Sequence, residues 1–200
     1  MRLFSIAAVA AANAFILVHY VWAIRKKRIQ PALAMWVFFT VAVLGSFATY
    51  LSEGAHSPLD NILNTSDIVL VVSVSLAILF FGDKSSRFTR FDLGCLGAVA
   101  AILVFWAFTR QHAAAHLAIQ AILVIAYFPV VKRIWTSDRN TESFAAWIGM
   151  LLAAALSLLS SKGWLATVYA VRAVVCTGSL LLLMLRARER ERRARLVGAK

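Results

Sequence analysis

The sequence predicts an all-α integral membrane protein, and three observations lead to that fold class. First, 62% of its 200 residues are hydrophobic, only 15% are charged, and the mean hydropathy is +0.79, which is too apolar for a soluble globular domain. Second, the chain contains seven apolar runs close to the length that crosses about 30 Å of hydrocarbon as a helix. Third, lysine and arginine residues gather after alternate runs, as they do in membrane proteins.

Seven transmembrane helices are predicted, with short connections that leave no room for a separate soluble domain. They lie near residues 3–24, 31–51, 66–82, 93–109, 113–131, 144–160 and 163–185. The first run contains the sequence AANA, which resembles a signal-peptidase site, but it continues well beyond that site and four cations follow it. We therefore expect it to remain as a transmembrane helix. Functional residues must then lie within the bundle.

The basic residues predict the orientation, because cationic loops tend to stay on the cytoplasmic side. Seventeen of the 21 lysine and arginine residues follow the first, third, fifth and seventh runs: Arg25, Lys26, Lys27, Arg28, Lys84, Arg87, Arg90, Lys132, Arg133, Arg139, Arg186, Arg188, Arg190, Arg192, Arg193, Arg195 and Lys200. The other side holds Arg2, Arg110 and Lys162. The N-terminus is therefore expected outside and the C-terminus inside, with the protein in a bacterial inner (plasma) membrane.

The net charge of +12 has a topological explanation and does not indicate nucleic-acid binding. The cations stand at membrane exits, where anionic lipid head groups meet them, so the expected partner is the lipid bilayer. The basic tail after residue 185 is expected to continue the last helix into solvent.

Motifs for catalysis, cofactors and metals are missing from the sequence. There is no CxxC, HExxH or GxSxG sequence and no glycine loop for phosphate, and the four histidines are scattered. Cys95 and Cys176 fall inside predicted spans and are expected to pack there as free thiols. We therefore expect no enzyme activity, no cofactor and no metal site.

An internal repeat relates the two halves of the chain. A shift of 107 residues places the first helix over the fifth, and a shift of 111 places the second over the sixth. The matched polar and aromatic pairs are Asn13 with Gln120, Tyr20 with Tyr127, Arg25 with Lys132, Trp36 with Trp147 and Ser46 with Ser157. Because one helix lies between the two copies, both copies run in the same direction across the membrane, as a parallel repeat.

The repeat divides the chain into four parts. They are a first three-helix repeat at residues 1–82, a linker helix with its flanking loops at 83–111, a second three-helix repeat at 112–185 and a basic cytoplasmic tail at 186–200. In the linker helix, Gly94, Gly97 and Ala98 form a small face suited to packing against a neighbouring helix or another copy.

This 3+1+3 arrangement, with Tyr127-Phe128-Pro129 followed by basic residues, resembles the SWEET and PQ-loop (MtN3-like) transporter superfamily and the related bacterial vitamin transporters, such as those for nicotinamide riboside. The resemblance implies transport by alternating access. The sequence departs from the family at Val130, which replaces the glutamine of the PQ loop, and at Trp22, which stands where the second copy has Pro129. The asparagine pair of the family has no obvious counterpart, so the resemblance supports the fold more than a particular solute.

Arg172 is the residue of the predicted bundle whose insertion into the membrane costs the most free energy, because it lies about nine residues inside the last span. A membrane-centre arginine costs roughly 2.5–3.5 kcal/mol on insertion scales, so it should face the bundle interior, as a contact for an anionic solute, as a gate latch or in a structural ion pair. Asp67 lies at comparable depth in the third helix. It either caps that helix or pairs with Arg172.

Further polar residues are predicted to line a midplane solute site or to bond neighbouring helices. Asn13 and Gln120 fall near the middle of their spans, and His116 lies one turn from Gln120 on the same face. His116 is either a proton-coupling residue or an interhelical bond. The predicted substrate-binding set is Asn13, Asp67, His116, Gln120, Tyr169 and Arg172.

Aromatic residues near the span ends are expected either to anchor the helices at the membrane interface or to flank a gate. This set is Tyr20, Trp36, Tyr127 and Trp147, together with Pro129. The function predicted from these residues is transport of a small polar, potentially anionic, solute. The alternative is a non-transporting subunit or assembly factor of a larger membrane complex, and a homo-oligomer is compatible with either.

Overall fold

The structure is a computed structural model, and it describes residues 1–29, 31, 33–82, 90–136 and 142–197. Within these ranges every regular element is a helix. The elements are α1 (Arg2–Arg25), α2 (Leu33–Glu53), the 3-10 helix η1 (Pro58–Asn61), α3 (Ile62–Phe81), α4 (Arg90–Thr109), α5 (His112–Ile125), α6 (Phe128–Thr136), α7 (Phe144–Ser157) and α8 (Trp164–Val197). The predicted loop cations Lys84, Arg87 and Arg139 and the terminal Lys200 lie outside the described residues.

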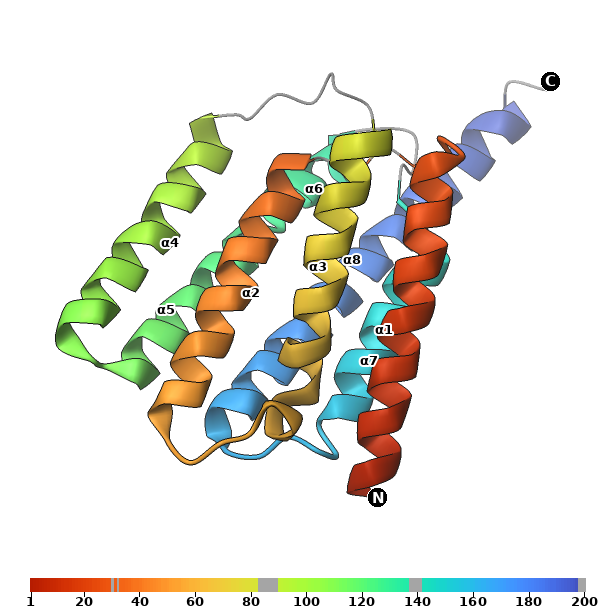
Figure 1. Cartoon of the computed structure of the whole chain (residues 1–200). Coiled ribbons are helices and arrows are strands. Elements are labelled where there is room, and N and C mark those ends of the chain that lie inside the picture. The colour runs from red at the N-terminus through yellow and green to blue at the C-terminus, as the bar shows by residue number, and fades with distance from the viewer. Residues whose placement is uncertain (30, 32, 83–89, 137–141, 198–200) are drawn as a thin grey trace.

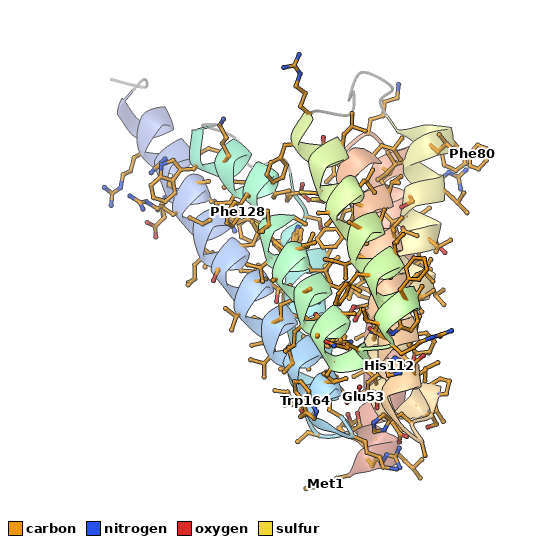
Figure 2. All side chains as sticks on the ribbon, turned by 90° about the vertical axis from the view of Figure 1, so that its left-hand side faces the viewer. Met1, Glu53, Phe80, His112, Phe128 and Trp164 are labelled. Carbon is orange, nitrogen blue, oxygen red and sulfur yellow. The ribbon has the colours of Figure 1, made fainter. Side chains whose placement is uncertain are left out.

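Six helical segments in the described ranges are long and apolar enough to cross a membrane, and α7 is a shorter apolar helix. These segments suggest an integral membrane protein. Successive long helices run in opposite directions, so the two chain termini lie at opposite ends of the bundle (Figure 1). Figure 2 shows Met1, Glu53 and Trp164 together at one end, which we call the N-terminal end, while Phe80 and Phe128 lie toward the other, C-terminal end.

The third transmembrane helix begins earlier than the sequence predicts, at Ile62 instead of residue 66. The η1 turn precedes it, with a capping box between Ser57 and Asp60. The Asn61 side chain then accepts a hydrogen bond from the Asn64 backbone N–H, which satisfies one of the free donors of the first turn. Asn61 is therefore the cap of α3. The prediction that Asp67 caps this helix is wrong, because Asp67 lies in its second turn.

The fifth predicted helix is divided at Ala126 and Tyr127 into α5 and α6. Pro129 follows this break as the second residue of α6. Proline has no backbone N–H and cannot continue the bonding ladder of the preceding helix, so a proline here favours a break. The short α6 packs against α8, which continues from the apolar span through the basic tail to Val197 as one helix. The predicted helical tail is confirmed up to that residue.

The helices pack in a regular order. In the first half of the chain α3 contacts both α1 and α2, and in the second half α8 contacts both α5 and α7. Between the halves, α1 packs on α7 and α2 packs on α5. The remaining long helix, α4, contacts α2 and α5 and lies at the edge of the bundle (Figure 1).

Gly149 allows α7 to approach α1 closely, and we expect a side chain there to destabilise the bundle. A Cβ atom at Gly149 would lie 2.8 Å from Ile16 Cγ1. Overpacking of this kind costs about 1–3 kcal/mol, so Gly149→Val should lower the thermal unfolding temperature in detergent. Gly97→Val is the matched control, because a Cβ atom at Gly97 has no neighbour within 4 Å. Equal shifts for the two variants would contradict a close α1–α7 contact.

Candidate functional site

A cavity of about 70 Å³ lies inside the bundle, where α1, α2, α3, α7 and α8 meet. One water molecule needs about 10–15 Å³ of such space, so the cavity has room for roughly five waters or a very small solute. Its polar lining comes from Asn13, Asp67, Tyr127, Tyr169, Arg172 and Thr177, and two tryptophans, Trp36 and Trp147, also face it. The cavity therefore brings together four of the six predicted substrate-binding residues.

Asp67 is held in this cavity by donors from two other helices. Asn13 Nδ2 on α1 donates to Asp67 Oδ1 at 2.9 Å and also lies 2.7 Å from Ser66 Oγ. The Tyr169 hydroxyl on α8 donates to Asp67 Oδ2 at 2.8 Å. Each carboxylate oxygen thus accepts a hydrogen bond. A carboxyl group buried in a membrane protein needs such partners, because an unsatisfied polar group in an apolar environment is costly.

Arg172 approaches the same cavity from α8 without pairing with Asp67. Its Nε donates to Gln120 Oε1 on α5 at 2.7 Å, and its Cζ lies 4.8 Å from the centre of the Tyr169 ring. Both charged residues are described, and no ion pair joins them, so the predicted direct pair is wrong. Tyr169 instead lies between them, donating to the carboxylate through its hydroxyl and contacting the guanidinium through its ring.

Gln120 and His116 lie outside the cavity lining, in the contact between α5 and α2. Gln120 Nε2 donates to Ser46 Oγ at 2.8 Å, so this amide connects Arg172 to α2. His116 is fully buried, and its Nδ1 lies 3.1 Å from the Ser46 carbonyl oxygen and 3.2 Å from Thr49 Oγ1. Of the two alternatives left by the sequence, this geometry matches the interhelical bond for His116. The Gln120 amide therefore positions the Arg172 side chain from the contact between α5 and α2, outside the cavity lining.

Five aromatic rings form a continuous cluster beside the cavity, on its side toward the C-terminal end. We call Tyr20, Trp36, Phe39, Tyr127 and Trp147 the aromatic cluster. Successive ring centres are 5.1 Å apart for Tyr20 and Trp36, 6.3 Å for Trp36 and Phe39, 5.5 Å for Phe39 and Tyr127, and 6.0 Å for Tyr127 and Trp147. These spacings are typical of attractive aromatic pairs.

The aromatic cluster is internal, unlike a membrane-interface belt. Tyr20, Trp36 and Trp147 are at most 3% exposed, whereas Trp135 and Trp164 are 51% and 52% exposed. The interface alternative is therefore wrong for the first three residues, and Trp135 and Trp164 are the ones in a belt-like environment. Pro129 lies in the backbone of α6, two residues after the cavity residue Tyr127.

Sequence reasoning missed Glu142, which joins two residues of the aromatic cluster. Its Oε2 accepts hydrogen bonds from the Tyr20 hydroxyl at 3.0 Å and from Trp147 Nε1 at 3.2 Å, and the residue is 5% exposed. The adjacent Ser143 caps α7 and lies 3.0 Å from His19 Nε2 on α1. Glu142 stands in a hydrophilic stretch that predicts a solvated loop, so no signal in the sequence marks it as buried.

A second polar group, also missed, lies at the opposite end of the bundle. Buried Asp60 accepts hydrogen bonds from Arg2 Nη2 and, at 2.8 Å, from the Ser57 backbone N–H. Lys162 Nζ lies 3.9 Å from Asp60 Oδ2, and the Lys162 backbone N–H donates to the Asp60 carbonyl oxygen at 2.9 Å. This group connects the start of α1, the η1 turn and the turn between α7 and α8. We call it the Asp60 cluster.

Trp36 carries a hydrogen-bond donor that no group of the described residues accepts. Its Nε1 is buried without a partner, although the ring is 3% exposed and lines the cavity. An unsatisfied buried donor costs about 1–3 kcal/mol. The charged donor that lines the cavity is the Arg172 side chain, which suits a small solute that carries acceptor oxygens.

In the described ranges, no three His, Cys, Asp or Glu side chains come together as a metal site. Compared with family models, curated proteins and solved structures, the chain matches none of them.

Proposed function

We propose that this chain is a small transporter of the 3+1+3 type, with two like-oriented three-helix units joined by α4. The packing order supports it: in each half the third helix contacts the first and second, and the first helix of each half packs on the second helix of the other. Such reciprocal contacts are what a two-fold relation between parallel repeats requires. In this proposal the C-terminal end faces the cytoplasm and the membrane is a bacterial inner membrane.

The observation that carries the proposal is the cavity between the two units. Its walls come from α1, α2 and α3 of one unit and from α7 and α8 of the other, so a change in their relative position would change access to it. The aromatic cluster with Glu142 lies toward one end, and the Asp60 cluster lies at the other. Alternating access then consists of opening one of these groups at a time while the solute stays on the cavity residues.

The solute class follows from the cavity's donors. The Arg172 side chain in the cavity lining favours a small solute with an anionic or strongly accepting group. The resemblance to SWEET and PQ-loop transporters fits the fold of the proposal, whereas the walls of this cavity favour an anion over a plain sugar. Asp67 already accepts bonds from Asn13 and Tyr169, so it balances charge in the site and leaves Arg172 to the solute.

Uptake by proteoliposomes tests the proposal. Purified protein is reconstituted and supplied with labelled organic anions, sugars, nucleosides and vitamins, and we expect saturable uptake of at least one anion relative to empty liposomes. Binding is followed in parallel by tryptophan fluorescence, since Trp36 and Trp147 line the cavity. Trp36→Phe should reduce the solute-dependent change, and Trp164→Phe, at an exposed position, should not. If no solute is transported and none alters the fluorescence, the protein is not such a transporter.

A second candidate function, a membrane subunit of a larger complex, is favoured by α4. A Cβ atom added at Gly94 or Gly97 would meet no atom of another part of the described chain within 4 Å, so the face predicted for close packing does not pack against it. Only 6% of its apolar stretch is buried. A subunit would use this face for a partner helix, and it would show no uptake when reconstituted alone.

A further inference from the structure

A groove of about 710 Å³ lies on the outer surface of the bundle between α1 and α3, near the C-terminal end. These two helices pack side by side (Figure 1). The volume falls within the range of about 300–1,000 Å³ that is typical of small-molecule sites. Ser73 lines the groove from α3. The wall on α1 consists of Leu17, Val18, Val21, Trp22, Arg25 and Lys26.

The α1 wall changes from apolar to cationic along the helix axis. Residues four apart lie above one another on a helix surface, so this wall consists of two rows that each begin with an aliphatic residue and end with a cation. The rows are Leu17, Val21 and Arg25, and Val18, Trp22 and Lys26. From the start of a row to its cation the helix rises about 12 Å, close to the roughly 15 Å of one hydrocarbon leaflet. The wall thus has the polarity of a lipid that lies along the helix.

The turn after α1 holds a further cation beside the groove. The Lys27 backbone N–H donates to the Ile24 carbonyl oxygen at 2.9 Å, and the Arg28 backbone N–H donates to the Ala23 carbonyl oxygen at 2.9 Å. These two bonds form a Schellman motif, with Lys27 at φ 53° in the position that glycine usually occupies. The reversal brings Arg28 back onto the groove residue Trp22, with its Cζ 4.4 Å from the ring centre.

We propose that this groove binds one anionic phospholipid of the leaflet at the C-terminal end, with the phosphate at Arg25 and Lys26 and an acyl chain along the aliphatic residues of the rows. The charge complementarity supports it. Both cations are exposed, and no ion pair joins either of them to a described acidic residue. The Arg25 Cζ lies 5.2 Å from the centre of the Phe81 ring, so this guanidinium is placed between α1 and the end of α3. A phosphate accepts charge-assisted hydrogen bonds from such cations.

The second half of the chain is built differently at the corresponding place, so one such site per chain is expected. Its first helix, α5, ends at Ile125, and α6 begins at Phe128. Pro129 stands there where the first half has Trp22, and a proline favours this break, whereas α1 continues unbroken to Arg25. The rows of α1 therefore have no continuous counterpart in α5. The groove is separate from the cavity, so its test does not depend on the proposed transport.

Native mass spectrometry tests the site, because it counts the lipid molecules bound to each protein. The protein is delipidated in detergent and titrated with dioleoyl phosphatidylglycerol or dioleoyl phosphatidylcholine. We expect one phosphatidylglycerol to bind at least tenfold more tightly than phosphatidylcholine. Arg25→Gln combined with Lys26→Gln should lower the affinity for phosphatidylglycerol about tenfold and remove this preference. Val18→Trp, which fills the groove, should weaken binding of phosphatidylglycerol by a similar factor.

Two matched variants serve as controls. Arg192→Gln combined with Arg193→Gln removes the same charge from exposed residues of α8, and Val104→Trp places the same side chain at an exposed valine of α4; none of these residues lines the groove. Both controls should leave the affinity for the first phosphatidylglycerol unchanged. The proposal is overturned if phosphatidylcholine binds the native protein as tightly, if the two charge variants lower the affinity equally, or if the two tryptophan variants behave alike. Circular dichroism and gel filtration verify folding, and the comparison of the two lipids on the native protein remains decisive if a groove variant does not fold.

Discussion

Arg172→Ala is expected to reduce solute uptake by roughly tenfold to a hundredfold while the protein remains folded. The substitution removes a charged donor from the cavity, and hydrogen bonds to charged groups contribute about 1.5–3 kcal/mol. It also removes an arginine whose insertion costs roughly 2.5–3.5 kcal/mol, so the unfolding temperature should hardly fall. Initial rates in proteoliposomes and thermal unfolding in detergent measure the two effects separately.

Two further variants make the role of the guanidinium specific. Arg172→Lys keeps the charge but lacks the planar fork, so it cannot donate to Gln120 Oε1 and a solute as the native guanidinium does. We expect an intermediate loss. Arg186→Ala is the matched control on the same helix, because Arg186 lies over the Trp135 ring, away from the cavity. Uptake that is unchanged in Arg172→Ala would show that this residue does not contact the solute.

The helices were predictable from the sequence because hydrocarbon length sets them directly, but their ends were not. The α3 helix starts earlier because Ser57 and Asn61 cap it, and these residues lie in a polar stretch whose hydropathy predicts a loop. A break precedes α6, two residues before Pro129, and a proline there favours it. In the sequence this proline is recognised as a helix exit only when the two repeats are compared. Capping and breaking are local hydrogen-bond events, and hydropathy does not register them.

The inward-facing polar residues could be predicted one by one, because each is costly in lipid and must face the bundle interior. Their partners could not. Asp67 is bonded to Asn13 and Tyr169 and not to Arg172, and Arg172 is bonded to Gln120. These choices depend on which helices pack together, and a sequence does not state that. Glu142 and Asp60 are harder still to predict, since both are buried acidic residues in stretches of sequence that predict exposed loops.

Asp60→Ala is expected to open the N-terminal end of the bundle. The substitution removes the acceptor for Arg2 and the Ser57 backbone N–H. Bonds to a charged group contribute about 1.5–3 kcal/mol, but the Arg2 and Lys162 side chains are 52% and 61% exposed, so solvent screens part of this. A remaining effect of roughly 1.4 kcal/mol shifts the balance between closed and open ends about tenfold.

The shift can be measured by labelling a cysteine placed in the cavity. Ala173→Cys is suitable, because Ala173 lines the cavity and is 8% exposed, and the background is made free of cysteine with Cys95→Ala and Cys176→Ala. A membrane-impermeant maleimide added from the N-terminal side should label this cysteine about tenfold faster in Asp60→Ala. Exposed Glu53 at the same end serves as control, and Glu53→Ala should leave the rate unchanged.

The same labelling experiment with Glu142→Gln tests the C-terminal end of the bundle. It weakens the acceptor shared by Tyr20 and Trp147 near the C-terminal end, so faster labelling is expected only from that side. Two groups that close opposite ends of one cavity must give these opposite results if access alternates. Faster labelling from both sides in either variant would indicate general loosening of the bundle. Unchanged rates in both variants would mean that neither group controls access to the cavity.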